Sequence, residues 1–271
     1  MTTARTAEPP RLPVRDRATA HARAWSGVSP MLNRLATEQA TGVLFREHGT
    51  LHLAGGLVVH AESPFAPGLD VLLTARGTLS AEDWQRALKE TDEDQDTGRL
   101  LVAGGLLAPG TLELCRLAAL YDAAYFALAS SSTPGRFRYG SAHPGGPERP
   151  VPVAALERET LRRRDLLHRI WPDPEPDTAP LIRADPVAAP ALTRRQRTVL
   201  NQVDGARTAS DIARAVGRLA FHTLVDVRRL TAAGFVEMRR EPPPPPPDLG
   251  QLSTDPHITL LKRLRDALEA L

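Results

Sequence analysis

Apolar and polar side chains alternate with a period of two early in the chain, which predicts three short β-strands joined by tight turns. The expected strands cover residues 42–47, 50–54 and 57–63. Leu51 and Leu53 fall on one face of the second strand and His52 on the other, as in a sheet with one buried face. Gly55 and Gly56 supply the positive φ values that a two-residue hairpin turn requires.

Apolar residues then recur every three to four positions, which predicts helices. The expected helices cover residues 69–76, 80–88, 98–103, 109–129 and 153–171. Ser80 caps the second of them, with Asp83 at the N3 position. Residues 135–139 are expected to return as a further strand. Strands followed by helices predict an α+β fold, with a small antiparallel sheet and helices packed on it.

A second, mostly helical unit is expected over residues 191–240. Thr193 caps its first helix and Thr208 its second, with Gln196 and Asp211 at the two N3 positions. The inward stripe of a third helix is formed by Phe221, Leu224, Val227 and Leu230. Gly234 ends that helix, and one strand follows it. This order predicts a helix-turn-helix or winged-helix module whose wing is absent or single-stranded, because a proline run begins directly after it.

Composition divides the chain into six segments. They are a disordered tail (1–24), the α+β domain (25–171), a Pro-rich linker (172–190), the helical module (191–240), a polyproline linker (241–254) and an amphipathic helix (255–271). Arginine far outnumbers lysine and alanine is abundant, which is typical of a high-GC bacterial genome. We therefore expect two folded domains joined by a linker.

Charge is concentrated in the helical module. The whole chain carries +2, but residues 191–240 contain ten arginines and four acidic residues. A basic module favours an anionic partner such as double-stranded DNA. The candidate DNA-contacting residues are Arg194, Arg195, Arg197, Thr208, His222, Thr223, Arg228 and Arg229. Asp226 is expected on the same solvent face as Thr223 and would repel phosphates, so a protein partner stays open as the alternative.

Four stretches resemble the PATAN domain, a bacterial domain of unknown function. They are 41–44 (TGVL), 56–61 (GLVVHA), 135–139 (GRFRY) and 156–165 (LERETLRRRD). Asp204 to Thr208 (DGART) also resembles the regulatory winged-helix modules that are fused to such domains. The family usually continues its closing helix with Asp-Glu-aromatic, whereas this chain has Asp165-Leu166-Leu167. The resemblance implies a scaffold or interaction role and supplies no reaction.

Motifs that would indicate catalysis or a cofactor are not found in the sequence. It contains no P-loop, Rossmann, zincin or nucleophile-elbow pattern. The single cysteine, Cys115, lies in an apolar stretch, which favours a buried inert thiol. His48, His52 and His60 are interpreted as surface histidines rather than zinc ligands. The acidic run 92–97 lacks the glycine and glutamate positions of a calcium loop. We therefore predict no catalytic residue, metal or cofactor.

Two further surfaces are candidates for binding a protein. Arg162 and Arg163 lie in an arginine run that could dock an acidic partner, although nearby glutamates make a solvated face equally consistent. Leu261, Leu264 and Leu268 form an apolar stripe on the last helix that could pack on another protein or protomer. The N-terminus lacks a secretory signal and no run of 18 apolar residues occurs, so a cytoplasmic protein without a membrane partner is expected.

These patterns together predict a non-catalytic bacterial regulatory protein. The leading hypothesis is a transcriptional regulator in which the first domain is tethered to a DNA-binding winged-helix module. The alternative is a signalling adaptor in which both domains bind proteins.

Overall fold

The structure is a computed structural model that describes residues 29–75, 77–91, 96–140, 143, 145–186, 190–239 and 268. The chain divides into a compact unit over Met1–Met238 and a second unit over Arg239–Leu271. Only Arg239 and Leu268 of the second unit are described. The predictions for the N-terminal tail, the polyproline linker, Leu261 and Leu264 therefore lie outside the described residues.

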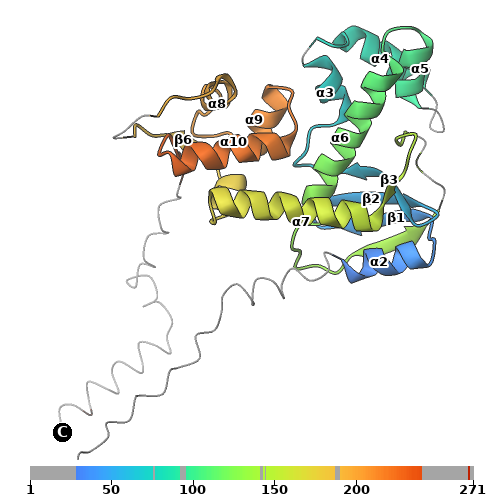
Figure 1. Ribbon diagram of the computed structural model, residues 1–271, viewed down its shortest axis with the longest axis horizontal. Helices are drawn as coiled ribbons and strands as arrows, with labels where there is room; N and C mark the ends of the chain where they lie inside the picture. The colour runs from blue at the N-terminus through green and yellow to red at the C-terminus, as the bar shows by residue number, and fades with distance from the viewer. Residues whose placement is uncertain are drawn as a thin grey trace, which may run out of the picture. The chain divides into compact units, whose positions relative to one another are not determined.

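The first part of the chain forms the predicted antiparallel sheet (Figure 1). Its strands follow the order β4-β1-β2-β3-β5. They are β1 (Gly42–Arg46), β2 (Gly49–Ala54), β3 (Leu57–Glu62), β4 (Arg136–Tyr139) and β5 (Val151–Pro152). The glycine hairpin turn is confirmed, with φ values of 55° at Gly55 and 80° at Gly56. The short strand β5, which pairs with Leu57 and Val58, was not predicted.

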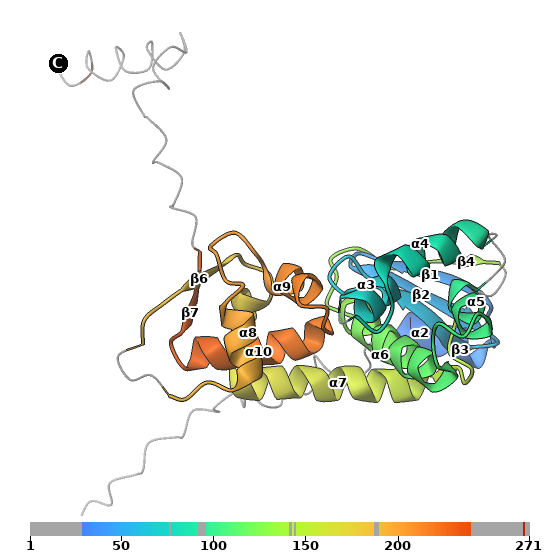
Figure 2. The same ribbon diagram turned by 90° about the horizontal axis from the view of Figure 1, so that it is seen from above.

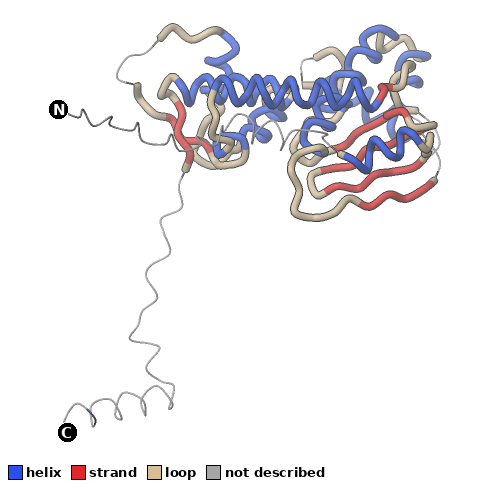
Figure 3. The backbone as a smooth tube through the Cα atoms, turned by 60° about the horizontal axis from the view of Figure 1, so that its bottom comes forward, coloured by secondary structure: helices blue, strands red, loops and turns tan. Residues whose placement is uncertain are grey.

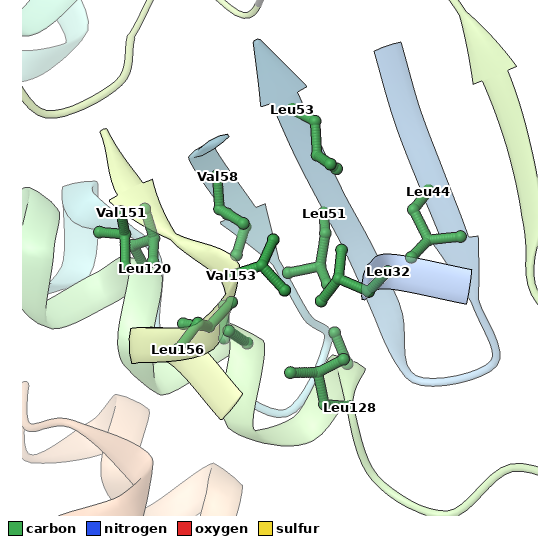
Figure 4. Packing of buried hydrophobic residues seen from close by; sticks show 14 of the residues in the cluster. Leu32, Leu44, Leu51, Leu53, Val58, Leu120, Leu128, Val151, Val153 and Leu156 are labelled. Carbon is green, nitrogen blue, oxygen red and sulfur yellow. The ribbon is translucent and has the colours of Figure 1, made fainter. Parts of the chain in front are cut away.

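Three helices pack against the leucine-bearing face of the sheet. They are α2 (Pro30–Thr37), α6 (Pro109–Ala127) and α7 (Val153–Ile170). Figure 4 shows how the buried side chains of this core lie between the strands and the helices. Leu51, Leu53, Leu120 and Leu156 are each at most 2% exposed, so the alternation read along β2 does mark the buried face.

Three shorter helices and the preceding turns form a second small core beside α6. They are α3 (Leu69–Thr74), α4 (Ala81–Glu90) and α5 (Thr97–Ala103). The predicted capping of α4 is confirmed, because Ser80 Oγ accepts from the backbone N–H of Asp83 at 3.0 Å. Local signals were thus sufficient to predict where these helices begin.

The helical module contains α8 (Arg194–Leu200), α9 (Ala209–Ala215), α10 (Ala220–Ala232) and β7 (Val236–Met238). Both predicted capping boxes form, at Thr193 with Gln196 and at Thr208 with Asp211. The inward stripe of α10 is buried as expected and belongs to the core of this module. In Figure 2, α10 lies alongside α7.

The segment 172–190, which we predicted as a linker, contains regular structure. A 3₁₀ helix, η1, covers Glu175–Asp177, and a strand, β6, covers Leu181–Arg183. Strand β6 pairs antiparallel with β7, with Leu181 opposite Met238. The prediction failed here because six prolines dominate the composition of the segment, whereas β6 itself contains none and Leu181 is fully buried. The partner of β7 therefore comes from before the helical module.

The predicted α+β class is confirmed by the antiparallel sheet and the helices around it. Figure 3 shows the long helix α7 running from the sheet toward the helical module. Within the residues described, no helix has both the length and the apolar character needed to span a bilayer.

Candidate functional site

The third helix of the helical module is the centre of the candidate site, because it is covered by the rest of the chain. Nine of the 13 residues of α10 are buried. Its neighbours include α7, η1 and the middle of α6, in addition to α8 and α9. His222 and Arg229 are exposed and lie two helical turns apart on one face. The solvent therefore reaches only a narrow stripe along most of α10.

A carboxylate from the first domain binds the N-terminus of α10. The N-cap residue Leu219 makes no side-chain capping bond. Instead, Oδ2 of Asp122 in α6 accepts from the backbone N–H of Ala220 at 2.6 Å, and Oδ1 accepts from Phe221 at 2.9 Å. A negative charge at this position satisfies free amide groups and interacts favourably with the helix dipole. Asp122 thus caps a helix that lies 98 residues later in the chain.

Burial makes Asp122 an unusual acid. Its side chain is fully buried, and this burial raises the pKa of the carboxyl to about 6, although the amides of Phe221 and Ala220 and the charge of Arg163 act in the opposite direction. Desolvation disfavours the charged form of any buried carboxyl. The contact between α6 and α10 therefore includes a group that changes its charge near neutral pH.

Arg163 on α7 contacts both α6 and α10 at this point. Its guanidinium donates to the backbone oxygen of Tyr121 at 2.9 Å and to Glu159 Oε1 at 2.8 Å. It lies 3.8 Å from Asp122 Oδ1 and 4.7 Å from the ring centroid of Phe221. A cation over an aromatic face is attracted by the ring electrons. Our interpretation of Arg163 as a partner-docking residue is wrong for this conformation, because its charge is used within the chain.

The other predicted docking arginine behaves differently. Arg162 is exposed and forms an ion pair with Glu159, with Nε 2.7 Å from Oε2. Exposed pairs of this kind add little stability. Arg162 therefore remains available on the surface, as the sequence predicted.

A second buried ion pair fixes the middle of α10. Arg228 Nε lies 2.8 Å from Asp177 Oδ1 and its Nη2 lies 2.6 Å from Oδ2, and Nη1 donates to the backbone oxygen of Trp171. Burial raises the pKa of Asp177 and the bonds from Arg228 oppose that rise. Arg228 was predicted to contact DNA, but it is only 5% exposed and binds η1 instead.

Asp226 and Thr223 also differ from the prediction, which placed both on a solvent face. Each is fully buried. Asp226 Oδ2 accepts from both Nη atoms of Arg218 at 3.2 Å, and its Oδ1 lies 3.5 Å from Arg195 Nη2 on α8. The hydroxyl of Thr223 donates to the backbone oxygen of Leu219 at 3.3 Å. Asp226 therefore binds α8 to α10 and does not face a partner.

The remaining predicted residues are dispersed. Thr208 caps α9 and is half-buried. Arg194, Arg197 and Arg229 are exposed, and no ion pair to them is found among the described residues. Leu268 is 69% exposed. Within the described part of the chain, three of the predicted arginines are thus exposed without an ion pair, whereas Arg228 is turned inward.

A cavity of about 780 Å³ adjoins the ion pair of Arg228. It is lined by the rings of Phe65, Tyr125 and Phe126 and by Arg164 from α7. Burial raises the pKa of the Tyr125 phenol to about 12, with a smaller contribution from the charge of Asp177. The volume of the cavity is in the range of small-molecule sites, and polar or charged side chains border it alongside the aromatic rings.

One feature of the sequence points to the buried contact of Asp122. Asp122 is the single acidic residue in the otherwise apolar stretch 117–127 of α6. A charge within an apolar helix segment indicates a buried partner.

No family model, curated protein or solved structure matches this chain.

Proposed function

We propose that this chain is a non-catalytic regulatory adaptor, in which the first domain binds the third helix of the helical module and the chain acts through contacts with other proteins. The observation that carries the proposal is the burial of α10 between Asp122 of α6, Arg163 of α7 and Asp177 of η1. A helix that reads DNA must insert into the major groove and present several side chains to base edges. The burial of Thr223, Asp226 and Arg228 argues against that use of α10 in this conformation.

Charge pairing adds to the argument. Each acidic residue of the module other than Glu237 is paired with arginine: Asp204 with Arg207, Asp211 with Arg214, and Asp226 with Arg218 and Arg195. Four of the module's ten arginines therefore already bind a carboxylate of the module, which leaves fewer guanidinium groups for phosphates although the net charge is unchanged.

A DNA-binding transcriptional regulator is the second candidate function. It is favoured by the exposed guanidinium groups of Arg194 and Arg197 on α8 and of Arg229 on α10, which form no ion pair with any residue that the structure describes. Arginines of this kind contact phosphates without regard to sequence, and they contact guanine edges where a helix enters the groove. In this version α10 would have to leave Asp122 before it could read bases.

The two functions are separated by selection of duplex DNA from a random-sequence pool. We would use the full-length chain, the variant Asp122→Ala, which releases the N-terminus of α10, and the matched control Glu82→Ala on the exposed face of α4. The adaptor proposal expects no enriched sequence with any of the three, and only weak binding that disappears as salt is raised. Enrichment of one sequence by the wild-type chain would refute the adaptor proposal, and enrichment by Asp122→Ala alone would favour a gated DNA-binding regulator.

A further inference from the structure

Three of the eight histidines of the chain meet on the sheet, at a place that the proposed function does not use. His52 on β2 and His60 on β3 are direct cross-strand partners. The ring of His143, which follows β4, stacks on His60 with centroids 4.0 Å apart and an angle of 7° between the planes. His52 meets the same ring edge-on at 4.8 Å. Two imidazoles from one hairpin and a third from about 80 residues later in the chain therefore share one surface of the sheet.

A carboxylate completes the cluster. Glu62 lies two residues after His60 on the same strand, so both side chains project from the same face. Glu62 Oε1 lies 3.2 Å from Nε2 of His60. One ligand atom each from His60, Glu62 and His143 lies within 4.8 Å of the other two. The stacked rings of His60 and His143 would have to tilt away from parallel for their nitrogen lone pairs to point at one ion between them.

Two of the imidazoles in the cluster have a lowered pKa. Burial, followed by the neighbouring His60 and His52, lowers the pKa of His143 to about 4. Burial and the charge of His60 lower the pKa of His52. A cation binds the neutral ring, because the protonated ring has no free lone pair. At pH 7 these two rings therefore have a lone pair to offer.

We propose that His60, Glu62 and His143 form a binding site for one Zn²⁺ ion, with His52 as the supporting imidazole beside it. Two histidines and one carboxylate are a ligand set that zinc accepts while keeping a position open for water or a further ligand. A cavity of about 320 Å³, which Trp84, Arg116 and Asp70 also line, borders His60 and Glu62 and can admit that further ligand.

Loading the site has a consequence at the backbone. The N–H of Gly145 donates to Nδ1 of His143 at 3.0 Å. A metal ion at Nδ1 replaces this hydrogen bond, whereas an ion at Nε2 moves the ring proton to Nδ1, which then no longer accepts. The Gly145 amide loses its acceptor in both cases, so its hydrogen exchange accelerates when zinc binds.

The test uses the tag-free, full-length chain, freed of metal by a chelator that is then removed, and titrated with ZnCl₂ in a calorimeter near pH 7.5. We expect saturable binding of one ion per chain, and faster exchange at Gly145 in the loaded protein. His60→Ala and His143→Ala should each weaken binding by at least about 100-fold, since loss of a group that merely supports a ligand already costs about 10- to 100-fold. His52→Ala should have the smaller effect of a supporting group.

His48→Ala is the matched control. His48 directly precedes strand β2, which carries His52, but its ring packs on that of Phe65, with centroids 5.6 Å apart, outside the cluster. This variant should bind zinc as the wild type does. His143→Ala keeps the test decisive if His60→Ala fails to fold, because His143 lies outside the strands. The proposal is overturned if the wild type shows no saturable binding, or if His143→Ala binds zinc as tightly as the His48→Ala control.

Discussion

Replacing Asp122 with alanine probes the contact between α6 and α10 most sharply. The change removes the acceptor of two buried N–H groups, those of Ala220 and Phe221, and each such orphaned donor costs about 1–3 kcal/mol. It also removes a carboxylate whose ionised form is disfavoured. A pKa of about 6, against 3.8 ordinarily, corresponds to about 3 kcal/mol at pH 7. At the middle of that range the two donors cost about 4 kcal/mol together, against the roughly 3 kcal/mol regained, so we expect a net loss of about 1 kcal/mol in the free energy of unfolding at pH 7.

Urea unfolding followed by tryptophan fluorescence measures this loss, with Glu82→Ala as an exposed control on α4. Trp84 lies in α4 and Trp171 follows α7, so the summed emission reports on both regions of the compact unit. The control should stay within about 0.5 kcal/mol of the wild type. If Asp122→Ala also stays within that range, the capping of α10 by Asp122 contributes nothing, and the reasoning is refuted.

Three further predictions concern the same unit. Asp122 binds its proton more tightly in the folded protein than in the unfolded chain, so its contribution to stability is fully present below about pH 4 and falls by about 3 kcal/mol as pH rises to about 6. The free energy of unfolding of the wild type should therefore fall over this pH range relative to that of Asp122→Asn. Parallel pH profiles of the two proteins would contradict this expectation. Arg228→Ala leaves the buried Asp177 unpaired and should lower the free energy of unfolding by about 3–5 kcal/mol, measured by urea unfolding with Arg194→Ala as the exposed control. Gly217→Ala should destabilise the chain by about 1–3 kcal/mol more than Gly205→Ala. Both glycines have positive φ, but of the two only Gly217 lies where an added Cβ would clash with the Cβ of Ala75 at the end of α3. Equal losses of stability on thermal unfolding would show that the turn before α10 is not in close contact with α3.

Elements set by short-range chemistry could be predicted from the sequence. The alternation of Leu51, His52 and Leu53 determined the buried face of β2, and Gly55 with Gly56 determined the hairpin. The capping threonines of α8 and α9 lie three residues from their partners. Each of these signals is complete within a few neighbouring residues, which is why it survives without knowledge of the fold.

Interactions between distant residues could not be predicted in this way. Strand β6 depends on β7, which lies more than 50 residues later, and proline-rich flanks concealed it. The histidine cluster was missed because His143 approaches the sheet from a loop about 80 residues after His60. The burial of Thr223 and Arg228 depends on α6, α7 and η1, and helical periodicity alone assigns one inward face to α10 rather than several.

Amide hydrogen exchange of the full-length chain tests the central claim most directly, because it reports whether the first domain holds α10. In the wild type we expect strong protection of the amides of residues 220–230 at pH 7. Protection at 220–223 should be lost in Asp122→Ala, while β1, β2 and β3 stay protected in both proteins. Fast exchange along α10 in the wild type, or equal protection in the two proteins, would contradict the account.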